Sequence, residues 1–288
     1  MKDLKLKKSC SRLGGADCII CISQVHDWSD VTKIKKGFEI NRTAKETLQL
    51  YNELIENEDE EIKRAGGDFE KRKGLTQKPL TDSDQHSITV THSYINCTSW
   101  FVKFLGRIKR EFFIWVEKKT ILGEHIRRGT EEVLDIIFED TGIPLERVNG
   151  SKSGTSTDGN SGRRFSSEEL IDSIKKCVPS KYIDDVLRLH MLLSSILRII
   201  SSTQCVNLEL YQDCCQEASL LIAEKFPWAH INYTLHGVLH HSSELIGLND
   251  NCGLGALSEE GLEAANKNIR LFLETHSRFL HLTKCVTL

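Results

Sequence analysis

Two groups of thiol and imidazole side chains, near opposite ends of this 288-residue sequence, are of the types that bind metal ions. Cys18 and Cys21 form a Cys-x-x-Cys pair, which supplies half of a tetrahedral zinc site. The second group is a histidine cluster, His236, His240 and His241. On a regular helix His236 and His240 share a face, whereas His236 and His241 lie about 140° apart. The spacing therefore identifies candidate metal ligands and leaves open which histidines take part.

A carboxylate with polar neighbours follows the histidines, on a predicted helix that begins at Ser258. Serine is a favourable N-cap, and the glutamates of the first turn complement the helix dipole. From Glu263, steps of three, four and seven residues reach Asn266, Lys267 and Arg270, so all four share one helical face. By pattern alone, such a face is typical of a solvated surface helix.

The string that starts at Ser258, SEEGLEAANKNIR, resembles a segment of the Transib transposases and of the catalytic subunit of the V(D)J recombination-activating complex. In that family, the final Glu of a DDE triad precedes a small-small-Asn-Lys run and follows a His-x4-His pair. The resemblance extends from Asp3 to about position 278. It implies an RNase H-like DDE recombinase in which Glu263 is a catalytic carboxylate.

The resemblance also implies a structural zinc site, which the family builds from a Cys-x-x-Cys pair and the distant His-x4-His pair. The corresponding residues here are Cys18, Cys21, His236 and His241. Their joint use requires the two ends of the chain to meet, and it requires the predicted helix over 231–248 to bend or end near His241. His26 and His240 are the alternative ligands.

The catalytic carboxylates implied by the resemblance are incomplete in this sequence. Asp3, followed by Leu-Lys-Leu, is the candidate for the second acidic residue of the triad. No residue corresponds to the first Asp, and the strands that would carry it are not found. We expect the C-terminal portion of a recombinase core, inactive alone, whose complete form uses two Mg²⁺ or Mn²⁺ ions held by carboxylates.

A Gly- and Ser-rich segment at 149–165 is a flexible linker by composition. It also resembles a Gly-x-Thr element of the same family that ends in two arginines. Backbone amides and hydroxyl groups can bind phosphate, and Lys152, Arg163 and Arg164 add positive charge. We therefore expect this segment to contact the DNA backbone.

Composition favours a mainly α-helical protein with a globular core. The net charge is −3, 39% of residues are hydrophobic and only four are proline. No signal peptide and no apolar run of about 18 residues is found, so no membrane partner is expected. The ten cysteines are expected to be reduced thiols or metal ligands. Cys205, Cys214 and Cys215, without a Cys-x-x-Cys arrangement, are expected to be structural.

The predicted organisation has four parts: the end of an RNase H-like part with the Cys-x-x-Cys pair (1–30), a helical insertion (31–148), the basic loop (149–165) and a helical zinc-binding region with the catalytic helix (166–288). Further helices are predicted over 43–65, where Thr43 and Glu46 can form a capping box, and over 95–119, whose aromatic stripe is expected to be core. Helices are also predicted over 120–140, 180–201 and 207–226. The resemblance implies a nuclear protein that binds DNA, as a homodimer in its complete form and with a possible second recombinase subunit. The alternative is a non-catalytic, zinc-stabilised DNA-binding or interaction module.

Overall fold

The computed structural model describes residues 2–3, 18, 20–40, 42–56, 75, 78–80, 86–110, 119–145, 157–258, 265, 268–269 and 271–272, and the structural statements below concern these residues. This part of the chain is mainly helical, as predicted. Its principal α-helices are α2 (Val31–Lys36), α3 (Ala44–Glu56), α5 (Val90–Lys109), α6 (Lys119–Thr141), α7 (Gly159–Phe165), α8 (Ile171–Cys177), α9 (Ile183–Ile200), α10 (Leu208–Lys225), α11 (Tyr233–His240) and α12 (Ser242–Gly247).

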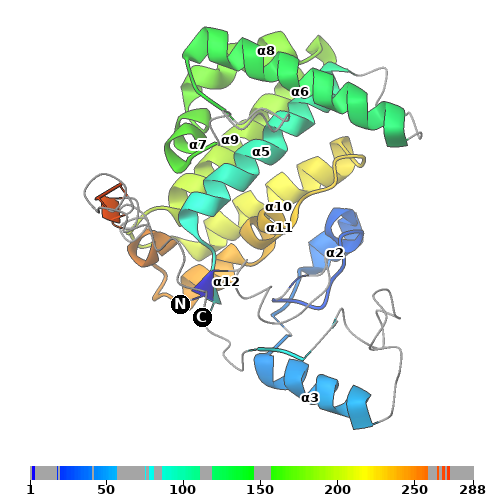
Figure 1. Cartoon of the computed structure of the whole chain (residues 1–288), viewed down its shortest axis with the longest axis vertical. Helices are drawn as coiled ribbons and strands as arrows, with labels where there is room; N and C mark the ends of the chain where they lie inside the picture. Colours follow the sequence, from blue (N-terminus) through cyan, green and yellow to red (C-terminus); the bar gives the residue numbers. More distant parts are fainter. Residues whose placement is uncertain are drawn as a thin grey trace, which may run out of the picture.

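Helix α5 is the centre of the bundle, and it packs against α6, α7, α8, α9 and α11 (Figure 1). Its buried face includes the aromatic stripe that was predicted to be core, from Trp100 through Phe104 to Ile108. Trp100 and Phe104 stack with ring centroids 5.2 Å apart, and Trp228 stacks on Phe104 at 5.5 Å. The helix thus holds the bundle together through offset aromatic contacts.

The boundaries of α5 differ from the predicted helix over 95–119. The helix begins at Val90, because Val90, Tyr94 and Cys97 continue the buried stripe toward the N-terminus. It ends at Lys109, and Arg110 has left the helical conformation at φ −100° and ψ 45°. Helix α6 matches the predicted helix over 120–140 to within one residue at each end.

Helix α3 confirms a prediction made from capping chemistry. The Thr43 hydroxyl accepts from the Glu46 amide at 3.1 Å, and the Glu46 carboxylate accepts from the Thr43 amide at 3.1 Å. This reciprocal pair is the capping box expected from the sequence. The described helix ends at Glu56, and the rest of the predicted range, to position 65, lies outside the described residues.

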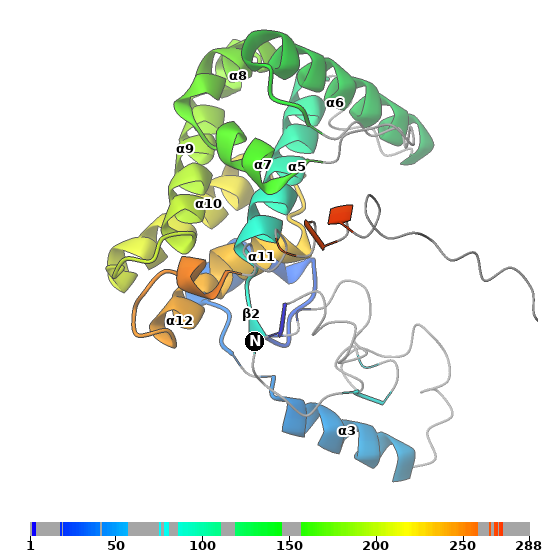
Figure 2. The ribbon, with the colours of Figure 1, turned by 60° about the vertical axis from the view of Figure 1, so that its left-hand side comes forward.

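Two short strands pair in parallel below the bundle: β1 (Lys2–Asp3) and β2 (His86–Ser87) (Figure 2). A pair of two-residue strands does not establish an RNase H-like fold, so that part of the fold prediction, like the four-part division of the chain, stays a prediction. Within the described residues, no helix is long and apolar enough to cross a membrane.

Candidate metal centre

The four predicted zinc ligands meet in the folded chain. Each of Cys18, Cys21, His236 and His241 offers one ligand atom, and these atoms all lie within 4.8 Å of one another. All four side chains are buried, with 0–2% of their surface exposed. The group brings residues more than 200 positions apart into one site, as the resemblance required.

The spacing of the ligand atoms fits tetrahedral zinc. Cys21 Sγ lies 3.5 Å from His236 Nε2 and 3.3 Å from His241 Nε2. Cys18 Sγ lies 3.6 Å from His241 Nε2. With Zn–S bonds of about 2.3 Å and Zn–N bonds of about 2.0 Å at tetrahedral angles, sulfur and nitrogen ligands stand about 3.5 Å apart. The group could therefore hold a metal ion such as zinc with little rearrangement.

A break in the helix brings His236 and His241 to the same site. The predicted helix over 231–248 is two helices, α11 and α12, separated at His241. His241 has φ −125° and ψ −11°, outside the helical range for φ. Asn232 caps α11, where its side chain accepts from the Leu235 amide at 2.8 Å. The break removes the angular separation that a regular helix would impose, and the expected bend or end near His241 is confirmed.

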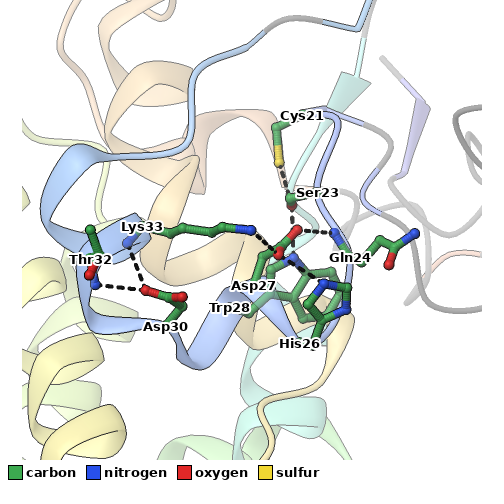
Figure 3. A network of polar contacts seen from close by, with 9 residues as sticks. All are labelled: Cys21, Ser23, Gln24, His26, Asp27, Trp28, Asp30, Thr32 and Lys33. Atoms are coloured by element: carbon green, nitrogen blue, oxygen red, sulfur yellow. Dashed lines mark hydrogen bonds and ion pairs between the residues drawn. The ribbon is translucent and has the colours of Figure 1, made fainter. Parts of the chain in front are cut away.

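The loop that carries the cysteines is folded around its own sulfur atoms. The Ile20 amide donates to Cys18 Sγ at 3.4 Å, and the Cys18 amide donates to Ser23 O at 3.2 Å. The Ser23 hydroxyl lies 2.9 Å from Cys21 Sγ and accepts from Trp28 Nε1 at 2.8 Å (Figure 3). Such contacts orient sulfur ligands before a metal binds.

Trp28 joins the cysteine loop to the histidine helix. Its indole stacks on the imidazole of His236 with ring centroids 4.2 Å apart and planes 14° apart. Phe38 contacts the same imidazole edge-on at 5.1 Å. The two aromatic rings restrict the orientation of His236, which has no hydrogen-bond partner at Nδ1 in the part of the chain that the structure describes.

Asp27 supports the loop through hydrogen bonds with the loop backbone and with α2 (Figure 3). Its carboxylate accepts from the Gln24 amide at 2.8 Å and from the ammonium group of Lys33 on α2. Burial by itself would raise the pKa of Asp27, but these hydrogen bonds outweigh it and hold the pKa below its usual value. Asp30 caps α2 by accepting from the Thr32 amide at 2.8 Å. The loop is therefore held on α2 by charged and capping contacts.

The pKa values of the two cysteine thiols are shifted in opposite directions. Burial would raise the pKa of Cys18, but hydrogen bonds with Cys21, His236 and His241 outweigh it and hold that pKa well below its usual value. The hydrogen bond with Cys18, together with burial, raises the pKa of Cys21. Two adjacent buried thiolates repel each other, so the second one needs a cation nearby. A divalent metal supplies that charge, and two thiolates with two neutral imidazoles make a neutral zinc complex.

His241 has a carboxylate partner behind it. Its Nδ1 lies 3.4 Å from Glu244 Oε2. Burial would lower the pKa of His241, but hydrogen bonds with Cys18 and Glu244 outweigh it and raise the pKa to about 9. A carboxylate on the far nitrogen of a ligating histidine fixes its tautomer and increases its basicity. Nε2 is thereby left as the metal-binding atom.

The alternative ligands lie outside the group. His240 packs against Phe38 with ring centroids 4.6 Å apart, and its Nε2 lies 3.5 Å from Ser219 Oγ. The side chain of His26 is 73% exposed and lies beside Asp27. The structure therefore selects His241 over both.

The structure describes only some of the residues that were predicted to be catalytic or to bind DNA. Glu263 and Lys152 lie outside the described residues. Asp3 lies in β1, and its side chain also lies outside what the structure describes. The catalytic carboxylates thus stay a prediction.

The second half of the predicted basic loop is not a loop. Asp158 accepts from the Ser161 amide at 2.7 Å and caps α7, which carries both predicted arginines. The guanidinium of Arg163 lies 5.1 Å from the centre of the Tyr94 ring. Arg164 Nη2 donates to Thr141 O, at the C-terminal end of α6, at 2.9 Å. The glycine-rich composition concealed a capping signal, and both arginines have partners within the protein.

Just after α9, the fold brings together a pair of cysteines that no sequence pattern predicted. Cys205 and Cys252 face each other across an isolated antiparallel β-bridge. They are 47 positions apart, and no local spacing relates them. Only the folded chain makes this pair visible.

The chain was compared with protein-family models and with curated proteins, and neither comparison gives a match. The fold and the buried Cys2His2 group therefore define it as a mainly helical protein with a candidate zinc centre.

Proposed function

We propose that the chain is the zinc-binding, C-terminal part of a DDE-type DNA recombinase core. The observation that carries the proposal is the convergence of Cys18, Cys21, His236 and His241, a ligand set implied by the resemblance to the Transib and V(D)J recombinases. The same resemblance assigns Glu263 to the next helix along the chain, so the metal centre would fix the region that presents this carboxylate.

Zinc in this proposal has a structural role. Four protein ligands complete a tetrahedral shell, whereas a catalytic zinc ion keeps one position open for water or substrate. The site is also buried and lined by Trp28 and Phe38, so it offers no path for a DNA phosphate. Its contribution is to hold the loop at the beginning of the chain against α11 and α12.

Phosphoryl transfer is assigned to a separate site with oxygen ligands. The resemblance implies that two divalent ions, Mg²⁺ or Mn²⁺, are held by three carboxylates, and the sequence offers Asp3 and Glu263 for two of them. An incomplete site binds Mg²⁺ weakly and misplaces the nucleophile, which can lower the rate a hundredfold or more. We expect no appreciable nicking of duplex DNA by this chain alone.

A fusion tests the catalytic part of the proposal. Joined to the upstream catalytic segment of a Transib transposase, the chain should nick duplex DNA in Mg²⁺ or Mn²⁺. Glu263→Gln should abolish nicking while zinc content stays at one per chain, since glutamine keeps the shape but loses the charge. Nicking that survives Glu263→Gln would reject this carboxylate, and Glu260→Gln is the next variant to measure.

DNA binding is proposed for the face of α7 that carries Arg163 and Arg164. Changing both to Gln should weaken binding to all sequences and reduce the slope of log K against log salt by up to about two. A matched control is the double variant of Arg127 and Arg128 on α6, which removes the same charge from arginines paired with Glu131 and Glu124. Equal slopes for the two double variants would assign α7 a structural role only.

The second candidate function is a non-catalytic, zinc-stabilised binding module. It is favoured by the same buried ligands, which complete a structural zinc site without any catalytic carboxylate. The fusion separates the two functions, because a binding module would retain zinc and DNA affinity but never gain nicking.

A further inference from the structure

The thiols of Cys205 and Cys252 lie close enough to react with each other. Their Sγ atoms are 3.7 Å apart, with no bond between them. Cys205 is exposed to solvent, and Cys252 is half-buried. Neither belongs to the candidate metal centre, and no third ligand of the described chain joins them.

The backbone around the two cysteines has the geometry of a cross-strand disulfide. The Val206 amide donates to Asn251 O at 2.8 Å, and the Gly253 amide donates to Gln204 O at 3.1 Å. These bonds flank the bridge, so the cysteines form a non-hydrogen-bonded antiparallel pair. Opposite residues in such pairs have Cα atoms about 4.5 Å apart, inside the range of about 4.4–6.8 Å that disulfides occupy. The bond therefore needs little more than side-chain rotation.

The loops that carry the pair are held together independently of the sulfur atoms. Asp250 and Asn251 adopt positive φ angles of 53° and 58°, which turn the chain back toward the end of α9. A side chain at Gly253 would place Cβ 2.3 Å from Ser202 O, so the two backbones are in direct contact there. These backbone contacts therefore hold Cys205 and Cys252 opposite each other without a bond between their sulfur atoms.

The surface beside Cys205 offers access to a small oxidant. Cys205 lines a hollow of about 620 Å³ together with Arg198, Asn207 and Cys214. The volume accommodates a tripeptide, and the charge of Arg198 favours an anionic one. Glutathione disulfide consists of two such anionic tripeptides, and the exposed Cys205 is the thiol that it reaches first.

We propose that Cys205 and Cys252 are an oxidation site at which a small-molecule disulfide, such as glutathione disulfide, forms a disulfide bond between them. The Cys205 thiolate attacks one sulfur of the oxidant, and one glutathione leaves as its thiol. The Cys252 thiolate then attacks the Cys205 sulfur and releases the second glutathione. Two protein thiols lose two protons and two electrons, and the oxidant becomes two molecules of glutathione.

The new bond would close a loop that contains the histidine ligands. The cysteines are 47 positions apart, and the segment between them contains α10, α11 and α12. The bond would also anchor the chain just before Ser258, where the segment of Glu263 begins. Shortening the unfolded chain in this way stabilises the folded state. The site thus couples oxidation to the stability of the zinc-binding half of the bundle.

Peptide mapping tests the bond in the full, zinc-loaded chain. After treatment with glutathione disulfide and alkylation, digestion with trypsin and a Glu-specific protease separates Cys205 from Cys214 at Glu209. We expect a peptide pair joined through Cys205 and Cys252, present in Cys214→Ser and absent in Cys252→Ser. Recovery of Cys205 as a stable glutathione adduct, or joined to Cys214, would overturn the proposal.

Thermal unfolding supplies a second readout. The disulfide should raise the unfolding midpoint by about 10 °C in the zinc-loaded chain, and a reductant should reverse the shift. Cys252→Ser and Cys252→Ala should show no shift with the same oxidant, which excludes oxidation elsewhere as the cause. An equal shift in these variants would also overturn the proposal.

Discussion

The metal centre and helix α7 both carry residues with predicted chemistry, but their side chains have different surroundings. At the metal centre, two thiols and two imidazoles turn toward one another in a buried space. On α7, Phe165 enters the core, Arg163 lies over the Tyr94 ring, and Arg164 donates to the end of α6. The four ligand side chains converge on one point that a metal ion could occupy, whereas both arginines of α7 already have partners within the protein.

Energetics explains why this difference matters. Burying polar or ionisable groups is unfavourable unless they are paired, so a buried cluster of four metal-ligand side chains needs a cation to offset that cost. The two arginines of α7 do not carry this free-energy cost, because they are partly exposed and have carbonyl and aromatic partners. The geometry of the candidate centre therefore indicates by itself that a metal ion binds there. DNA binding by α7, in contrast, is inferred only from the resemblance and from charge.

Removal of a cysteine ligand should have the largest effect. In Cys18→Ser, bound zinc should fall from about one per chain to near zero, and the free energy of unfolding should fall by about 4 kcal/mol or more. Metal analysis of purified protein and chemical denaturation measure the two quantities. His26→Ala is the control, because this exposed histidine lies outside the ligand group. One zinc per chain in Cys18→Ser would reject the centre.

Loss of the carboxylate behind His241 should weaken zinc binding without removing it. Glu244→Gln should lower zinc affinity by about tenfold, the smaller end of the range for such partners, because the Glu244 side chain is 39% exposed. Competition with a chromophoric chelator measures the affinity. Glu209→Gln, on the exposed first turn of α10, should leave it unchanged. Equal affinities in both variants would show that Glu244 does not position His241.

Adding a methyl group at Gly162, between α7 and α5, tests whether α7 packs tightly against α5. A Cβ at Gly162 would lie 3.0 Å from Tyr94 Cβ and 3.1 Å from Tyr94 C. Gly162→Ala should therefore destabilise the protein by about 1–2 kcal/mol, with zinc content unchanged. A methyl group at Gly123 on α6 meets no described atom within 4 Å, so Gly123→Ala should be neutral or stabilising by about 1 kcal/mol. A neutral Gly162→Ala would indicate that α7 is loosely held.

The smallest effect is expected from His190, which holds the C-terminal end of α7. Its Nε2 donates to Phe165 O at 2.9 Å, and burial holds its pKa below the usual value despite this bond. The unfolded chain therefore binds a proton more readily, and stability falls as pH drops below about 6.5. Denaturation at pH 7.5 and 5.5 should show a smaller acid-induced loss in His190→Gln than in the unchanged protein. An identical loss would exclude His190 as a contributor.

Local chemistry explains which elements were predictable. The capping box of Thr43 and Glu46 depends on residues three positions apart, and it is present as expected. The cap at Asp158 was concealed because glycine and serine around it indicated a linker. The start of α5 was placed too late, since its first turn is stabilised by burial in the bundle rather than by a local signal.

The amino-acid sequence by itself determined the helical class and, through the resemblance, the four candidate zinc ligands. Regular helix geometry pointed to His240, and only the tertiary structure decided for His241, because the chain breaks there and turns its imidazole toward Cys18 and Cys21. The pairing of Cys205 with Cys252 was likewise decided by the fold. Contacts between positions 47 or more than 200 residues apart arise from packing of whole elements, which no local spacing encodes.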